Sequence, residues 1–63
     1  PVAMAVARRS VIDRVWLLVV PNCPLCGGKH VHGGGSEARP HTGPRAAHCG
    51  RGGYVVAIER VES

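Results

Sequence analysis

The sequence predicts a small β domain of three to four short antiparallel strands, with little or no helix. Residues 11–20 and 54–58 are rich in β-branched side chains, which favour strands. Glycine and proline separate these runs, and no segment shows the 3.6-residue spacing of an amphipathic helix. The 63 residues include no Phe, one Trp and one Tyr, so the core must be small. Domains of this size commonly need a cross-link or a bound metal ion.

The chain divides into an arm, a domain and a long loop. Residues 1–10 tolerate strand or helix and are interpreted as an N-terminal arm, which leaves 11–63 as the β domain. The strand over 11–20 ends at Pro21. Residues 33–44 contain four Gly and two Pro and no large apolar side chain, which predicts a mobile loop. The strand over 54–58 follows a second glycine-rich turn.

Three cysteines carry the clearest chemical signal. Cys23 and Cys26 stand in the sequence C-P-L-C-G, a tight turn that directs two thiolates at one tetrahedral ion. Cys49 is the third expected ligand, because an odd number of cysteines does not suit a disulfide framework. We therefore predict a structural Zn²⁺ site. Metal binding by thiolates also suits a reducing, cytoplasmic setting.

The fourth ligand must be a histidine, since there is no further cysteine. If residues 28–32 leave the turn and 45–49 return antiparallel to them, Cys49 arrives near Gly28. His30 then lies one step from the metal on the same face of its strand. The expected order of preference is His30, His48, His32 and His41.

The run Val15–Val20 bears on membranes and on partners. Its six apolar residues fall far short of the ~20 that span a bilayer, so we expect no membrane segment. An unbroken apolar strand predicts either burial on both faces or one face covered by another chain. That chain would be a protein partner or a second copy.

The formal net charge of +4 is compatible with DNA or RNA binding. The cations expected to contact phosphates are Lys29, Arg39, Arg45 and Arg51. From the sequence, nucleic-acid binding in transcription regulation is the first prediction, although no finger with a recognition helix is present. The alternative is a protein-interaction module or a small subunit of a larger, phage-related assembly.

Catalysis is not expected. The triplet His30-Val31-His32 together with Tyr54 matches an element of some nucleases, but those enzymes need a larger sheet than this chain can form. A zinc hydrolase keeps an open metal position and usually a nearby carboxylate base. The acidic residues are all remote in sequence from the cysteine turn.

The pattern C-P-x-C-G-x-x-H-x-H-G at 23–33, R-x-A-H-C at 45–49 and G-Y-V-V at 53–56 resembles small, mostly uncharacterised zinc-finger proteins of actinobacteria and their phages. The resemblance covers the C-terminal two-thirds of the chain. It implies that the three cysteines and His30, His32 and His48 matter, without dividing them between roles. Pro44 stands where that group often has a histidine. At fold level the turn resembles a zinc ribbon, with the second C-x-x-C reduced to Cys49.

Overall fold

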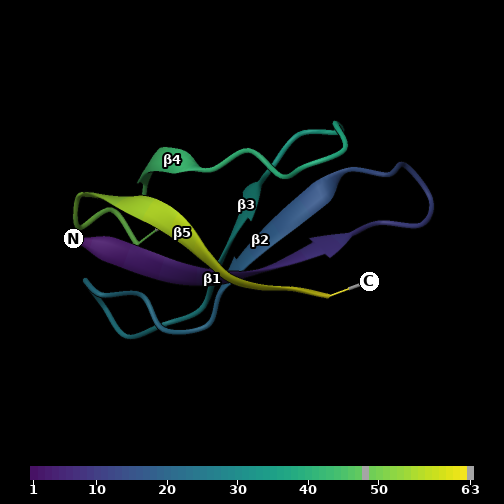
Figure 1. Cartoon of the computed structure of the whole chain (residues 1–63). Coiled ribbons are helices and arrows are strands. Elements are labelled where there is room, and N and C mark those ends of the chain that lie inside the picture. Colours follow the sequence, from purple (N-terminus) through teal and green to yellow (C-terminus); the bar gives the residue numbers. More distant parts are fainter. Residues whose placement is uncertain (48, 63) are drawn as a thin grey trace.

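The computed structural model describes residues 1–47 and 49–62. They form one five-stranded sheet with the order β3-β2-β1-β5-β4 (Figure 1). The strands are β1 (Val2–Arg9), β2 (Trp16–Val20), β3 (His30–Gly33), β4 (Gly43–Ala46) and β5 (Gly53–Glu62). No helix occurs in the described residues, and none is therefore available to cross a membrane. The prediction of a small all-β domain is confirmed, with more strands than expected.

The extra strand comes from the segment interpreted as an N-terminal arm. Residues 2–9 instead form β1, the central strand of the sheet. Ala3 and Ala5 are buried while Val2 and Met4 are exposed, which is the two-residue alternation of a strand. Alanine on the buried side hid this alternation in the sequence. β1 also pairs with β5 in parallel, whereas only antiparallel pairs were predicted.

The strand predicted over 11–20 begins later, at Trp16. Val11 and Ile12 lie in the turn between β1 and β2, where they are 95% and 92% exposed to solvent. The Ser10 N–H donates to the Val15 carbonyl (3.0 Å) and closes this hairpin. The β-branched residues at its tip favour extended backbone, but the pairing of β1 with β2 required a turn there.

The predicted pairing of 28–32 with 45–49 is wrong. β3 pairs with β2, with His32 opposite Leu18. β4 pairs with β5, with Arg45 opposite Tyr54. The two short strands therefore lie at opposite edges of the sheet.

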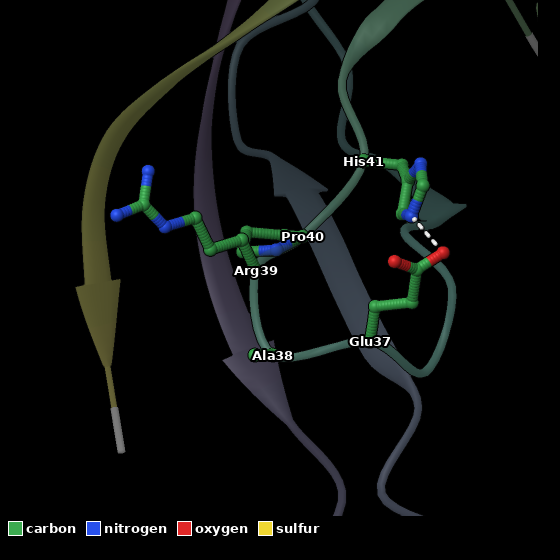
Figure 2. Close-up of a pocket in the computed structure, with 5 residues that line it drawn as sticks. All are labelled: Glu37, Ala38, Arg39, Pro40 and His41. Atoms are coloured by element: carbon green, nitrogen blue, oxygen red, sulfur yellow. Dashed lines mark hydrogen bonds and ion pairs between the residues drawn. The ribbon is translucent and has the colours of Figure 1, made fainter.

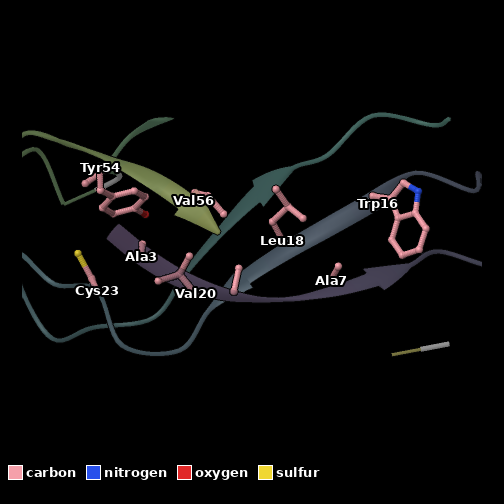
Figure 3. Close-up of a cluster of buried hydrophobic side chains, with 10 residues drawn as sticks. Ala3, Ala7, Trp16, Leu18, Val20, Cys23, Tyr54 and Val56 are labelled. Carbon is pink, nitrogen blue, oxygen red and sulfur yellow. The ribbon is translucent and has the colours of Figure 1, made fainter. Parts of the chain in front are cut away.

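The sheet is strongly curled around its own core. His32 on β3 contacts Tyr54 on β5, although β2 and β1 lie between these strands in the sheet. Figure 3 shows the core as one row of side chains, with Trp16 at one end and Cys23 and Tyr54 at the other. The small alanines of β1 suit the concave side of such a sheet. The buried apolar set is Ala3, Ala5, Ala7, Trp16, Leu18, Val20, Cys23, Ala47, Tyr54 and Val56.

The opposite side of the sheet carries exposed apolar side chains, and we call it the outer face. Its exposed members are Val2, Met4, Leu17, Val31 and Val55. They share a face because Val2 is opposite Val55, and Val19 is opposite Val31. The sequence predicted that Val15–Val20 would either be buried on both faces or have one face covered by another chain. In the structure one face of β2 packs into the core and the other face is not fully buried, so burial on both faces does not occur.

The loop expected over 33–44 is attached to the core at Trp16. The Trp16 backbone N–H donates to the Gly35 carbonyl (2.7 Å), and its indole N–H donates to the Glu37 carbonyl (2.8 Å). The Arg9 guanidinium stacks over the Trp16 ring, 5.3 Å from its centroid. The mobility of this loop stays a prediction.

Candidate metal centre

The first half of the candidate site is the turn between β2 and β3. The Cys23 N–H donates to the Gly28 carbonyl (2.8 Å), and the Gly27 N–H donates to the Cys23 carbonyl (2.8 Å). Gly27 has φ of 76°, in the left-handed region where an L side chain is strained. The glycine after Cys26 therefore lets the chain fold back so that both sulfurs point to the same side.

Backbone amides also contact the two sulfurs of this turn. The Leu25 N–H donates to Cys23 Sγ (3.4 Å), and the Gly28 N–H donates to Cys26 Sγ (3.4 Å). Donors aimed at sulfur stabilise the thiolate, the form that binds metal.

The pKa values of the two thiols move apart. Burial raises the pKa of Cys23, but the Leu25 amide and the thiols of Cys26 and Cys49 outweigh it and lower that pKa. The Gly28 amide lowers the pKa of Cys26, but burial and the neighbouring sulfurs outweigh it and raise that pKa. Sulfurs this close cannot all ionise readily without a cation between them.

Cys49 comes from a second turn, between β4 and β5. The Ala47 N–H donates to the Gly52 carbonyl (2.8 Å), and the Gly50 N–H donates to the Ala47 carbonyl (3.1 Å). Gly50 has φ of 74°, close to the 76° of Gly27. Each turn thus places a left-handed glycine directly after a cysteine.

His30 supplies the fourth donor from the first position of β3. Its Nε2 lies 3.3 Å from Cys26 Sγ. The donor atoms of Cys23, Cys26, His30 and Cys49 all lie within 4.8 Å of one another. A tetrahedral zinc site has donor–donor distances of about 3.5–3.8 Å, given its usual Zn–S and Zn–N bonds. The set therefore fits a metal ion after a small inward movement of the side chains.

These are the four residues that the sequence predicted as ligands, but His30 arrives by another route. The prediction relied on pairing between 28–32 and 45–49, which the sheet does not contain. His30 reaches the site because β3 pairs with β2, with His30 opposite Val20. The turn that holds Cys23 and Cys26 connects these two strands, so their shared end lies at the site.

The other histidines have different surroundings. His32 Nε2 lies 2.5 Å from the Tyr54 hydroxyl oxygen, and their rings meet edge to face at 88°. Both residues are buried. His41 lies 3.0 Å from a carboxylate oxygen of Glu37 in the long loop (Figure 2). His48, the second choice for the fourth ligand, lies outside the described residues.

Tyr54 connects the core to the cluster electrostatically. Burial raises the pKa of its phenol, and the negative charge of the Cys23, Cys49 and Cys26 thiolates raises it further. The phenol therefore stays neutral and remains hydrogen-bonded to His32. The sequence associates Tyr54 with the His30-Val31-His32 triplet only as a nuclease-like element, and it does not predict the buried hydrogen bond between Tyr54 and His32.

The four cations predicted for nucleic-acid binding are not gathered in one place. Lys29 and Arg51 are exposed in the two cysteine turns. The Arg45 guanidinium donates to the His41 carbonyl (3.3 Å) and the Gly33 carbonyl (3.5 Å), and so ties β4 to the long loop.

Arg39 belongs to the long loop between β3 and β4. Figure 1 shows this loop at the end of the molecule opposite the turn between β2 and β3. Arg39 lines a shallow pocket of about 370 Å³ made by loop residues 37–41. Figure 2 shows its side chain pointing away from the Glu37–His41 pair. Arg39 therefore does not share one phosphate-binding surface with Lys29 or Arg51.

Comparisons with protein-family models, curated proteins and solved structures gave no match to this chain. The resemblance to C-P-x-C-G zinc-finger proteins therefore stays a prediction.

Proposed function

We propose that the cluster holds one Zn²⁺ ion with a structural role. The supporting observation is the convergence of Cys23, Cys26, His30 and Cys49, with donor atoms within 4.8 Å of one another. Three thiolates and one imidazole suit zinc better than the hard cations Mg²⁺ or Ca²⁺. Four protein donors fill a tetrahedron, which is the arrangement of structural zinc sites.

The ion would join two parts of the sheet that also meet at that end through the buried pair of His32 and Tyr54. Cys23, Cys26 and His30 belong to the β2–β3 end, and Cys49 belongs to the β4–β5 turn. Apart from Trp16 and Tyr54, the core consists mainly of small Ala and Val side chains. The free energy of metal binding would then supply much of the free energy of folding.

Cobalt(II) substitution tests the donor set. Cobalt in a Cys₃His site gives thiolate-to-cobalt charge-transfer bands and the visible bands of tetrahedral geometry. We expect both in the wild-type chain and weaker charge-transfer bands in Cys49→Ser. Bands typical of octahedral cobalt would reject the proposed site.

We further propose that the zinc-stabilised domain is a protein-interaction module that binds through its outer face. Exposed apolar surface gathered on one face marks interaction sites in soluble proteins. A groove of about 450 Å³ lies on this face, where Leu17, Val19 and Val31 meet the β1–β2 hairpin. Arg8 and Glu62, 3.6 Å apart, border the same groove and add a polar rim.

Nucleic-acid binding, the first prediction from the sequence, has less support than protein binding. Its four cations divide between the metal end and the long loop, so no observation unites them in one phosphate-binding surface. If the chain bound mixed DNA and RNA at low salt, and if this binding weakened steeply as salt rises, nucleic-acid binding would become the better supported function.

Site-specific photo-crosslinking in cells tests the outer face. A photoreactive residue at Leu17, on the outer face, should form a defined adduct with a different polypeptide. The same residue at Ala38, exposed in the long loop, should not form it. Equal labelling from both positions, or no adduct from Leu17, would reject the proposed interface.

A further inference from the structure

The C-terminal half of β5 has an unpaired edge. β5 spans Gly53–Glu62, but β4 pairs only with its residues 53–56. Residues 57–62 pair with β1 on one side, and no described strand pairs with them on the other. We call this segment the free edge of β5. Such an edge offers unpaired N–H and C=O groups to another strand.

A bulge sets which side chains of the free edge share a face. Ile58 is opposite Ala5 and Val61 is opposite Ala7, while Glu59 has no partner on β1. Both alanines are buried, so Ile58 and Val61 lie on the core side of the sheet. In a regular strand, residues three apart would lie on opposite faces.

The same bulge puts two opposite charges side by side. Arg60 is opposite Val6 on the outer side. Its guanidinium lies 3.6 Å from the Glu59 carboxylate, although the two residues are consecutive. This contact agrees with the two bulge residues leaving the strand on the same side.

We propose that two copies of this chain pair antiparallel through their free edges, related by a two-fold axis between Glu59 and Arg60. In this register, Glu59 is opposite Arg60 of the second copy, and Ile58 is opposite Val61 of the second copy. Each pair occurs twice by symmetry. The paired residues share a face only because of the bulge, so the strand is complementary to itself.

Neighbouring registers lack this complementarity. A two-fold axis at Glu59 places two glutamates opposite each other, and one at Arg60 does the same with two arginines. Like charges directly opposite destabilise strand pairing, and opposite charges stabilise it. The segment thus favours a single register with a second copy of itself.

The charge of the free edge is also compatible with a second copy of the chain as its partner. The chain carries +4 overall, which opposes self-association. The free edge, with two Glu and one Arg, carries −1. Glu62 lies 3.6 Å from the Arg8 guanidinium, so one cation of the neighbouring strand also borders the edge. With Arg8 counted, the edge has no net charge that would repel a second copy.

Charge reversal tests the pairing on the full zinc-loaded chain, by sedimentation velocity. Wild type should approach 13.2 kDa, twice the 6.6 kDa of one chain, as its concentration rises. Glu59→Arg alone and Arg60→Glu alone should each weaken association about tenfold or more, because both symmetric pairs become repulsive. An equimolar mixture of the two variants should restore it as a heterodimer.

The double variant Glu59→Arg/Arg60→Glu is the matched control, because it keeps the composition and restores complementary pairs. It should associate like wild type. A wild type that stays at 6.6 kDa at about 1 mM, or single variants that associate undiminished, would overturn the proposal. Association lost in Leu17→Lys but kept in both charge variants would also overturn it, because it would place the contact on the outer face. Thermal unfolding of each variant checks that the fold is intact.

Discussion

Cys26 Sγ and His30 Nε2 lie 3.3 Å apart, four residues from each other along the chain. The contact joins the first cysteine turn to the first residue of β3. Because β3 pairs with β2 in the folded sheet, the imidazole of His30 lies beside the sulfurs of the turn. The β2–β3 connection therefore brings three of the four donors together in the folded chain.

Replacing His30 should impair metal binding more than replacing His41. His30→Ala removes a donor, and we expect zinc affinity to fall by more than about 100-fold, since loss of an outer partner alone costs 10–100-fold. His41→Ala, in the long loop, should leave the affinity unchanged. Competition with a chelator of known affinity measures both variants. Equal affinity in His30→Ala and wild type would contradict the assignment.

Removing the Tyr54 hydroxyl should destabilise the fold. Tyr54→Phe leaves the buried His32 ring without its hydroxyl partner, and we expect a loss of about 1–3 kcal/mol in the free energy of unfolding. Denaturant unfolding with excess zinc measures this loss. The exposed substitution Val55→Thr is the control and should change stability by less than ~0.5 kcal/mol. A Tyr54→Phe change as small as the control's would contradict the role of the pair.

The ionisation of Tyr54 should be displaced upward in pH. Burial, followed by nearby thiolates, raises the pKa of this phenol, so the folded state favours its neutral form. Its contribution to stability should be full below the ordinary tyrosine pKa of about 10 and decline as pH rises through the higher folded value. Absorbance near 295 nm follows it cleanly, because Tyr54 is the sole tyrosine in the sequence. Titration at the ordinary value in the folded chain would argue against burial of the ring.

Glycine substitutions should separate backbone strain from crowding. A Cβ at Gly27 or at Gly33 meets no atom within 4 Å, but Gly27 alone of the two has positive φ. We expect Gly27→Ala to cost about 1–2 kcal/mol and Gly33→Ala less than about 0.5 kcal/mol. Chemical denaturation of the zinc-bound variants gives both values. Equal costs would show that left-handed backbone at Gly27 is not required.

The sequence predicted which residues form the candidate metal cluster better than it predicted the sheet that carries them. The spacing of Cys23 and Cys26 is a local signal, and the turn that contains them forms locally. The position of His30 depends on which strand pairs with β3, a long-range choice that local patterns do not contain. The pairing was predicted wrongly, yet His30 lies only four residues from Cys26 and reaches the site either way.

The central strand was missed for a different physical reason. In β1, the larger side chains Val2 and Met4 face outward, and Ala3 and Ala5 face the core. Hydrophobic contrast between the two faces is therefore small, and alanine also tolerates helix. Residues 11–15 gave the opposite error, because the β-branched residues Val11 and Ile12 in the turn suggested a longer strand than the hairpin allows.

Titration of zinc into the metal-free chain, followed by near-UV circular dichroism, tests the central claim most directly. Trp16 and Tyr54, both buried in the core, report the fixed packing of the folded state. A structural Cys₃His site predicts that their signal develops in proportion to zinc, reaches its limit at one ion per chain and disappears on chelation. A metal-free chain with the full near-UV signal, unchanged by zinc, would contradict the account.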